Sequence, residues 1–317
     1  MKRILITGGA GFIGSNLAKK LLEDENNKVI CIDNFDPFYS TRQKELNVEG
    51  LKANKRFKFI GGSIRSMDDL NKAKGVDVII HLAAKTGVRP SIHEPGVYYD
   101  VNVKGTQTLL EFAKQQKIQQ FVFGSSSSVY GINKNVPWKE NENLLPISPY
   151  ASTKLSCEML GHVYHHLYGM RFIALRFFTV YGPAQRPDLA IHKFFKSILN
   201  DKPIPVFGDG TTSRDYTFVD DIVKGIISAI SYTASGYEII NLGNYKSVGL
   251  NELIKMIENI SGKNAIIEKL PEQPGDVRST YADISKAKKL LGYDPRTTLE
   301  DGLKSFYSWF TANTSEI

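Results

Sequence analysis

The chain is poor in cysteine and has no long apolar run. Its 317 residues include two cysteines, Cys31 and Cys157, which cannot build the disulfide framework of a small secreted domain. Both fall in predicted regular elements, so we expect reduced core residues. No window reaches the ~18 apolar residues of a membrane span, and the opening "MKRILITGG" has no secretory segment. We therefore expect a cytoplasmic protein with no membrane partner.

The chain also lacks a dense cluster of one charge. Its net charge is +7, but the basic residues are spread along the sequence, as in "KANKRFK" and "SKAKKL". We interpret them mainly as solvated surface, with a secondary bias toward a small anionic ligand. No nucleic-acid-binding motif accompanies them, so no nucleic acid is expected as a partner. With 42% apolar residues, the chain can form one or two globular domains with a core.

Short apolar runs alternate with helix-like segments in the first half of the chain. The runs, rich in Ile, Val and Phe, are residues 3–8, 28–33, 56–62, 76–84, 119–126 and 171–178. Such runs are typical of strands buried on both faces of a parallel sheet. Helices are predicted between them at 12–25, 95–117 and 150–168. The alternation predicts an α/β fold with a doubly wound parallel (Rossmann) sheet, in which the more alternating run 56–62 lies nearer an edge.

The sequence becomes rich in turn residues after Phe178. One more strand is predicted at 237–243, followed by a helix at 249–261, a short strand near "AIIEKLP" and a terminal helical region. We predict two interleaved domains. The larger one takes in residues 1–178 and about 216–243, and a smaller C-terminal domain that covers a substrate takes in 179–215 and 244–317.

The first predicted strand ends in "TGGAGFIG", where Gly8, Gly11 and Gly14 form G-x-x-G-x-x-G. At a strand-to-helix turn, these glycines would permit a tight turn, a close approach to a pyrophosphate at the helix N-terminus, and close packing of helix on sheet. A purely structural glycine turn is the alternative. The position between a clear strand and a clear amphipathic helix favours dinucleotide binding.

The second predicted strand ends in Asp33. A carboxylate there can accept both ribose hydroxyls of an adenosine and would repel a 2′-phosphate. Asn34 follows without an adjacent arginine, so NAD is favoured over NADP. Arg42 is close enough in sequence to leave NADP open.

A candidate catalytic pair lies in "SPYASTK", where Tyr150 precedes Lys154 by one helical turn. The lysine charge would stabilise a phenolate, which tyrosine, with an unperturbed pKa of about 10, does not form by itself at neutral pH. A second Tyr-x-x-x-Lys, Tyr130 and Lys134, falls in a predicted loop. A surface pair on a helix is the alternative for Tyr150 and Lys154, and the glycine motif upstream weighs against it.

Together these motifs resemble the extended short-chain dehydrogenase/reductase family, in its nucleotide-sugar epimerase branch. The resemblance rests on "TGGAGFIG", Asp33, "HLAA", "SSSSVYG", Tyr150-x-x-x-Lys154, "RFFTVYGP" and "GDGTTSRDY", in the right order over nearly the whole chain. It implies tightly held NAD, with Tyr150 taking the proton from the sugar 4-hydroxyl while hydride leaves C4. The 4-keto sugar turns over and hydride returns to its other face, so the net reaction is an isomerisation. The catalytic serine would be Ser126.

The resemblance also implies which residues contact the cofactor. They are Gly8, Gly11, Phe12, Ile13, Asp33, Asn34, Ser63, Ile64, Leu82, Ala83, Ala84, Asn102, Tyr150, Lys154 and Phe177. Ser63 is a departure, because the family often has an acidic residue there that contacts adenine. A hydroxyl can still accept a hydrogen bond, so NAD binding is expected to survive.

The serine run "SSSS" bears on the substrate. Related 4,6-dehydratases read Thr-Asp-Glu at the positions of Ser126, Ser127 and Ser128, and UDP-glucuronate decarboxylases carry a glutamate at the last. Without a carboxylate, elimination has no obvious acid and base. The stretch around Thr179 and Arg186 is similar to that of UDP-glucuronate 4-epimerases, which makes UDP-glucuronate the expected substrate. The substrate-binding residues implied are Arg89, Ser127, Ser128, Thr179, Arg186, Val206 and Arg214.

Several alternatives stay open at this point. A 4-epimerase for UDP-glucose or UDP-N-acetylglucosamine shares the fold and mechanism, and UDP-glucuronate decarboxylase is less favoured. Two further alternatives are not epimerases: an oxidoreductase that releases NADH, and a non-catalytic scaffold that senses NAD. His162, His165 and His166 share a helix without other ligands at metal spacing, so no metal site is expected. Asp220 and Asp221 are expected to cap a helix and to interact favourably with its dipole. The resemblance implies a homodimer in which the helices 95–117 and 150–168 form the contact between the two copies.

Overall fold

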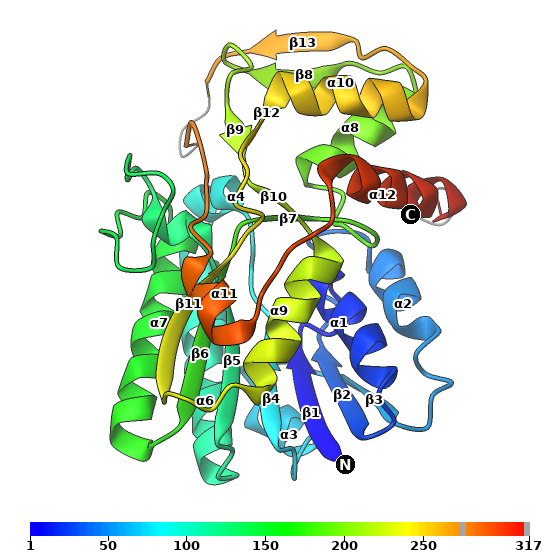
Figure 1. Cartoon of the computed structure of the whole chain (residues 1–317). Helices are drawn as coiled ribbons and strands as arrows, with labels where there is room; N and C mark the ends of the chain where they lie inside the picture. Colours follow the sequence, from blue (N-terminus) through cyan, green and yellow to red (C-terminus); the bar gives the residue numbers. More distant parts are fainter. Residues whose placement is uncertain (273–276, 314–317) are drawn as a thin grey trace.

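A seven-stranded parallel sheet forms the centre of the computed structural model, which describes residues 1–272 and 277–313 (Figure 1). Its order is β11-β6-β5-β4-β1-β2-β3, and every neighbouring pair is parallel. The strands are β1 (Lys2–Thr7), β2 (Asn27–Asp33), β3 (Phe57–Gly61), β4 (Val78–His81), β5 (Gln120–Ser126), β6 (Arg171–Phe177) and β11 (Tyr237–Leu242). The predicted doubly wound α/β fold is therefore confirmed, and the run predicted nearer an edge is the edge strand β3.

The sheet is buried on both faces, as its apolar runs predicted. In β1, Ile4 and Ile6 belong to one core cluster, while Leu5 between them belongs to the other. This alternation follows from the two-residue period of a strand. Cys31 and Cys157 are buried and free, one in each cluster, as expected for reduced core residues.

Helices cover both faces of the sheet. On the first face lie α1 (Phe12–Leu22) and α9 (Val219–Ser231), and on the other lie α6 (Gly105–Gln115) and α7 (Pro149–Tyr168). Shorter helices are α2 (Thr41–Glu49), α3 (Met67–Asn71), α4 (Val88–His93) and α5 (Pro95–Tyr98). The single helix predicted at 95–117 is in fact α5, a π-helical turn over Tyr99–Lys104, and α6.

Helix α7 shows why its predicted bounds were right. The Ser148 hydroxyl accepts a hydrogen bond from the Ala151 backbone N–H at 3.2 Å, and Pro149 occupies the first turn. Gly169 ends the helix in the left-handed conformation, with φ of 66°. The start of this helix is therefore fixed by local sequence.

A second region stands above the carboxyl ends of the sheet (Figure 1). It contains α8 (Ala190–Leu199), β8 (Ile204–Phe207), α10 (Leu250–Ser261), β13 (Ile267–Leu270) and α12 (Leu299–Asn313), with β8 and β13 paired in parallel. Two small sheets link it to the first region: β7 (Thr179–Tyr181) with β10 (Tyr216–Phe218), and β9 (Ser213–Arg214) with β12 (Val248–Gly249). Helix α8 was missed, because it lies between turn-rich segments.

The chain passes between the two regions more than once. It leaves the large sheet after β6, returns through β10 and α9 to form β11, and leaves again toward α10. Helix α11 (Ser285–Leu291), assigned by sequence to the substrate domain, packs against β11 and α9. The domain boundaries themselves stay a prediction.

Asp220 and Asp221 lie in the first turn of α9, where their charges suit the helix dipole as expected, but neither residue caps the helix, which corrects the other half of the expectation. Phe218 is the N-cap residue, and it makes no side-chain capping bond. The buried Asp221 carboxylate instead accepts the Thr297 backbone N–H at 3.1 Å and pairs with Lys224 at 3.0 Å. Asp221 therefore ties a distant segment to the helix. None of the described helices is long and apolar enough to span a membrane.

Candidate active site

A cavity of about 890 Å³ opens at the carboxyl ends of the central strands and reaches toward the second region. In doubly wound sheets this edge, where the strand order reverses, is the usual ligand site, and here the reversal lies between β1 and β4. Every predicted cofactor residue except Asn102 lines the cavity, as do Ser126, Ser127, Ser128, Thr179 and Arg186. The structure thus brings together residues that are up to 178 positions apart, from Gly8 to Arg186.

The glycine turn after β1 leaves no room for side chains. Gly8 has a φ of +71°, and a Cβ on it would lie 2.8 Å from the Ala83 backbone nitrogen. A Cβ on Gly14 would lie 2.2 Å from the Gly8 carbonyl oxygen, so α1 can approach the strand only with glycine there. No side chain caps the N-terminus of α1, and its first residues, Phe12 and Ile13, line the cavity. Uncapped N–H groups at a helix start suit a pyrophosphate.

Asp33 ends β2 at the wall of the cavity. Its carboxylate accepts the backbone N–H groups of Ala10 at 3.1 Å and Phe35 at 2.9 Å. Burial raises its pKa, while these hydrogen bonds and the charge of Lys44 oppose the rise. Arg42, which left NADP open, lies on the exposed side of α2, 3.9 Å from Glu45. The cavity wall at Asp33 therefore fits a ribose with free hydroxyls.

Tyr150, Lys154 and Ser126 meet on one wall of the cavity. The Lys154 ammonium donates to the Gly124 carbonyl at 2.7 Å and lies 4.8 Å from the centre of the Phe123 ring. Burial lowers the pKa of Lys154 to about 8. Burial also raises the pKa of Tyr150, but hydrogen bonding to Ser126 and the charge of Arg186 lower it. Burial is the largest of these effects, so the pKa of Tyr150 is raised overall, and Ser126 and Arg186 only partly offset that rise.

The serine run is the end of β5 and the start of a 3₁₀ turn, Ser127–Tyr130. The Ser126 hydroxyl accepts the Ser128 backbone N–H at 3.2 Å and donates to the Ser128 hydroxyl at 3.0 Å. The Ser125 hydroxyl donates to Glu158 at 2.6 Å. All four serines line the cavity, so the run is a structured wall of the site.

Arg186 lines the same cavity as the serine run. Its guanidinium makes two parallel hydrogen bonds of 2.9 Å to the Asp188 carboxylate. It also lies 5.9 Å from the centre of the Phe38 ring. Thr179 lines the cavity at the start of β7.

Three predicted substrate residues do not line this cavity. The Arg89 guanidinium lies over the Phe207 ring, 4.4 Å from its centre. Val206 is 4% exposed and packs into the core through β8. Arg214 donates to the Ser213 carbonyl at 2.8 Å. Arg89 lies on α4, Val206 on β8 of the second region and Arg214 on the linking strand β9, so any role in binding concerns the part of a ligand that extends beyond the cavity.

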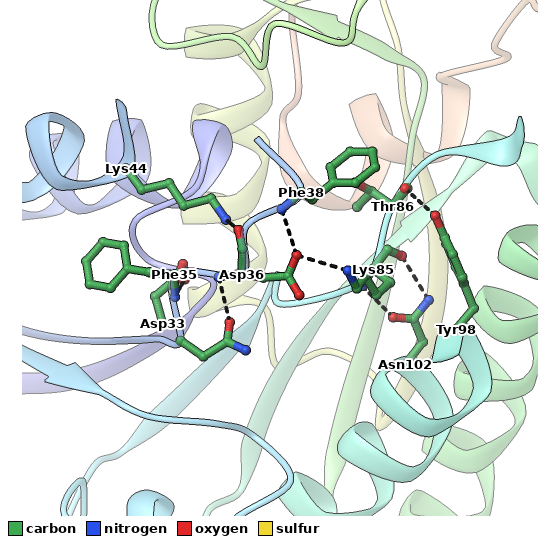
Figure 2. A network of polar contacts seen from close by, with 10 residues as sticks. Asp33, Phe35, Asp36, Phe38, Lys44, Lys85, Thr86, Tyr98 and Asn102 are labelled. Atoms are coloured by element: carbon green, nitrogen blue, oxygen red, sulfur yellow. Dashed lines mark hydrogen bonds and ion pairs between the residues drawn. The ribbon is translucent and has the colours of Figure 1, made fainter. Parts of the chain in front are cut away.

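Asn102 is the one predicted cofactor residue that does not line the cavity. It binds the main chain of Lys85, which does line it. Its amide accepts the Lys85 backbone N–H at 2.7 Å and donates to the Lys85 carbonyl at 3.0 Å. It also donates to the Thr153 hydroxyl at 3.0 Å, beside Lys154. Figure 2 shows the Asn102 amide facing the Lys85 main chain. The structure supports an indirect role for Asn102 in place of direct contact.

Sequence reasoning missed a group of residues after β2 and β4 that line the cavity. They are Asp36, Phe38, Tyr39, Lys44 and Lys85. The Tyr39 hydroxyl is buried and has no hydrogen-bond partner, as would suit a group that meets a ligand. No spacing rule connects these positions, although Asp36 and Lys44, which follow Asp33 closely in the sequence, could have drawn attention to their segment.

Two histidine features are structural. His81 of "HLAA" is held between the hydroxyls of Thr7 at 2.7 Å and Thr106 at 2.9 Å, and burial lowers its pKa to about 3. His162 belongs to the group of helix histidines for which no metal site was expected. Its ring packs edge-on against the Tyr237 ring, with 5.0 Å between the ring centres. Among residues 1–272 and 277–313, no group of three or more metal-ligating side chains occurs.

The fold and the site together define a member of the extended short-chain dehydrogenase/reductase class. Residues 5–306 match the family described as GDP-mannose 4,6 dehydratase, and the chain belongs to this family. The resemblance inferred from the sequence motifs is thereby confirmed.

Individual relatives are more specific than the family description. A UDP-glucuronate 4-epimerase of Thermodesulfobacterium geofontis is 42% identical over 314 residues, which is 98% of this chain and 96% of that protein. The crystal structure of UDP-glucuronic acid 4-epimerase from Bacillus cereus, in complex with UDP-glucuronic acid and NAD, has 42% identity and a TM-score of 0.93, covering 98% and 99% of the two chains. A UDP-N-acetylglucosamine 4-epimerase from Methanobrevibacter ruminantium M1 has 34% identity and a TM-score of 0.91, with the same coverage.

Proposed function

We propose that this protein is an NAD-dependent isomerase that converts UDP-glucuronate to UDP-galacturonate through a transient 4-keto sugar. The observation that carries this proposal is the composition of the cavity wall beside Tyr150. Ser126, Ser127 and Ser128 stand there with no carboxylate among them, and Arg186 lines the same cavity. Elimination or decarboxylation with a protein carboxylate is not supported by such a wall, whereas hydroxyls and a guanidinium suit an anionic C6 group.

The cofactor site supports NAD. Its uncapped helix start, its close glycine turn and its half-buried Asp33 fit a pyrophosphate and an unphosphorylated adenosine ribose. When bound, NAD supplies the hydride acceptor that oxidises C4 of the sugar and the donor that reduces it again. Ser63 presents a hydroxyl at the adenine end, where it already accepts the Arg65 backbone N–H at 3.2 Å, so its proton remains available to a base nitrogen.

The protein's own residues move one proton. The Tyr150 phenolate oxygen takes the proton of the sugar 4-hydroxyl and returns it after the keto sugar has turned over. Lys154 keeps one N–H on the Gly124 carbonyl, which leaves two donors for a ligand, and we propose that its charge helps to offset the burial that raises the pKa of Tyr150. Ser126 completes the proton path between Tyr150 and the substrate hydroxyl.

The C6 carboxylate of the substrate requires hydrogen-bond donors to bind it. Thr179, Ser127 and Arg186 line one cavity and offer neutral and charge-assisted donors for it. A held carboxylate also protects the 4-keto intermediate, which is a β-keto acid, from losing CO2. A wild-type enzyme that forms UDP-4-keto-pentose as fast as it epimerises would contradict this protective role.

One experiment tests the proposed reaction. The purified protein is incubated with UDP-glucuronate, UDP-glucose or UDP-N-acetylglucosamine, without added cofactor, and the products are identified by NMR. We expect UDP-galacturonate and no accumulation of NADH. Stoichiometric NADH would indicate a net dehydrogenase, and no turnover of any substrate would refute the epimerase assignment.

The role of Tyr150 has a matched control on the same helix. Tyr150→Phe should abolish turnover and retain bound NAD, because it removes only the proton acceptor. Tyr168→Phe, at an exposed position of α7, should keep full activity. Turnover retained in Tyr150→Phe would refute the base assignment.

A second candidate is 4-epimerisation of UDP-glucose or UDP-N-acetylglucosamine. The observation that favours it is the bidentate pair of Arg186 with Asp188, because a guanidinium already matched by a carboxylate attracts a second one less strongly. The product analysis above separates the two candidates, since the neutral sugars would then turn over faster than UDP-glucuronate.

We also propose that two copies of the chain pair through α7 and its neighbours. Met159, Val163 and Leu167 are 48%, 45% and 59% exposed and follow one another at four-residue spacing, which places them on one face of α7. Ile92 and Val97 are exposed on α4 and α5, which contact α7. Val163→Glu should convert a dimer to a monomer in light scattering. A cytoplasmic location likewise stays a prediction.

A further inference from the structure

The loops that follow β2 and β4 are joined by an ion pair at the cavity. The Asp36 carboxylate lies 3.0 Å from the Lys85 ammonium, and both residues line the cavity. Figure 2 shows the two side chains reaching toward each other from opposite loops. The partners are 49 positions apart in sequence, so only the fold brings them together.

The order of the strands shows that this ion pair spans the end of β1. Strand β1 pairs with β2 on one side and with β4 on the other, so it lies between them. Neighbouring strands are about 4.8 Å apart, and the ends of β2 and β4 are therefore about 10 Å apart. A bond between their loops has to pass over the carboxyl end of β1, which is the glycine turn at Gly8 and Gly11. The proposed function places the cofactor pyrophosphate at that turn.

Each end of the ion pair is anchored. Asp36 also accepts the Phe38 backbone N–H at 3.0 Å, and its carbonyl accepts a hydrogen bond from the Lys44 ammonium at 2.5 Å. The main chain of Lys85 is held by the two hydrogen bonds from Asn102. Figure 2 shows these contacts as one connected network. The ion pair therefore closes a strap between two fixed points.

The strap also reaches the substrate side of the cavity. Phe38, two residues after Asp36, has the Lys85 ammonium 5.8 Å from its ring centre and the Arg186 guanidinium 5.9 Å from it. Cations at this distance from an aromatic ring are attracted to it. The loop 34–40 is thus held by three cationic side chains: Lys44, Lys85 and Arg186.

We propose that Asp36 and Lys85 form a clasp that retains NAD in the protein between turnovers by closing the two loops over the cofactor. The inference rests on the proposed function, because it needs NAD at the glycine turn. In a redox-neutral reaction, the cofactor has to remain bound while the keto sugar turns over, and a closed strap slows its escape. Asp36 and Lys85 are positioning residues in this role.

The test measures how fast bound NAD exchanges with the solution. Holoenzyme loaded with radiolabelled NAD is mixed with excess unlabelled NAD, and the label retained on the protein is followed over time. We expect Lys85→Met and Asp36→Asn each to speed loss of the label by about tenfold or more. The charge-reversed double variant, Asp36→Lys with Lys85→Asp, should bring the rate back toward the wild type.

The Asp36→Asn variant separates the clasp from a direct contact of Lys85 with a phosphate. If Lys85 only attracted the pyrophosphate, removing the negative charge of Asp36 would slow the loss of NAD. Faster loss in Asp36→Asn is expected only if the ion pair itself holds the loops. Slower loss, or no change, overturns the clasp.

Lys263→Met provides the matched control. It breaks another long-range ion pair, Lys263 with Asp201 at 2.8 Å, in the second region of the molecule. It should leave the exchange rate unchanged, and acceleration equal to that of Lys85→Met would refute a specific clasp. A wild-type protein that binds no NAD overturns the cofactor assignment, whereas active variants with unaltered exchange overturn the clasp alone.

Discussion

Two arginine–carboxylate pairs lie near the proposed catalytic residues Tyr150 and Lys154, and their geometry is almost the same. Arg176 makes hydrogen bonds of 2.9 and 2.8 Å to Glu158, and Arg186 makes two of 2.9 Å to Asp188. The first pair is sealed, with side chains 1% and 0% exposed, whereas the second is 18% and 30% exposed and faces the cavity. The two pairs therefore have similar hydrogen bonds but differ in their exposure to solvent.

The surroundings decide what each pair does. Arg176 and Glu158 join β6 to α7, and Glu158 also accepts the Ser125 hydroxyl, so breaking this pair would leave a charge in the core. Arg186 and Asp188 are two residues apart, and a ligand could replace one partner without moving an element of the fold. Each pair affects one proposed catalytic residue. Burial lowers the pKa of Lys154 and the charge of Glu158 partly opposes this change, whereas burial raises the pKa of Tyr150 and the charge of Arg186 partly opposes that change. The sealed pair holds β6 and α7 together, and we propose that the open pair serves the ligand.

The largest expected effect comes from breaking the sealed pair. Glu158→Gln should lower the free energy of unfolding by roughly 3–5 kcal/mol, because it leaves the Arg176 charge buried without its partner. Urea unfolding at neutral pH measures the difference. Asp188→Asn, the equivalent change in the open pair, should cost less than about 1 kcal/mol. Equal losses in the two variants would erase the distinction between the pairs.

The open pair should matter for the substrate instead. Arg186→Met should lower kcat/KM for UDP-glucuronate by roughly 10- to 100-fold, since it removes a hydrogen bond to a charged group worth about 1.5–3 kcal/mol. The value for UDP-glucose should change far less. Steady-state kinetics with both sugars provides the check. An equal loss of kcat/KM for both would mean that Arg186 does not recognise the carboxylate.

A smaller effect concerns the pH dependence of stability. Lys154 has a pKa of about 8 in the folded protein, because of burial, against 10.5 ordinarily. Between these values the unfolded chain binds more protons, so this lysine makes the ligand-free protein more stable as the pH rises from 8 toward 10.5, by up to about 1.4 kcal/mol per pH unit. Urea unfolding at two pH values in this window should show a rise in the wild type that is smaller in Lys154→Met. Parallel profiles would contradict the assigned pKa.

The smallest expected effect is a shift of the pH profile of activity. A general base works deprotonated, so its pKa sets the acid limb of kcat/KM. Arg186 lowers the pKa of Tyr150, and Asp188 neutralises part of its charge. The acid limb should therefore move to higher pH in Arg186→Met and to lower pH in Asp188→Asn. Shifts in the same direction in both variants would show that the pair does not act through its charge on Tyr150.

Sequence reasoning succeeded where the signal is local. The glycine turn, the apolar strands and the bounds of α7 each depend on consecutive residues, and the structure has them where predicted. Even the edge position of β3 followed from the more alternating pattern of its own seven-residue run, 56–62.

Sequence reasoning failed where a position depends on the fold. Asp36 and Lys85 meet only because β1 lies between their strands, and no spacing rule reports that. Arg89 lies over Phe207 in the second region, which its own segment cannot reveal. The expected cap at Asp221 was wrong because the carboxylate accepts a distant backbone N–H instead. Long-range partners of charged side chains are thus the part of the site that requires the structure.

The last strand of the large sheet, β11, has a consequence for the growing polypeptide on the ribosome. Strand β6 is complete at Phe177, but its neighbour β11 does not end until Leu242, roughly 65 residues later. Until then, β6 presents an open edge of backbone N–H and C=O groups, which can template pairing with another chain. At about 5–20 residues per second, synthesis leaves that edge uncovered for several seconds. The interleaved chain order that completes the sheet only with β11 therefore makes the nascent chain a candidate for protection by chaperones.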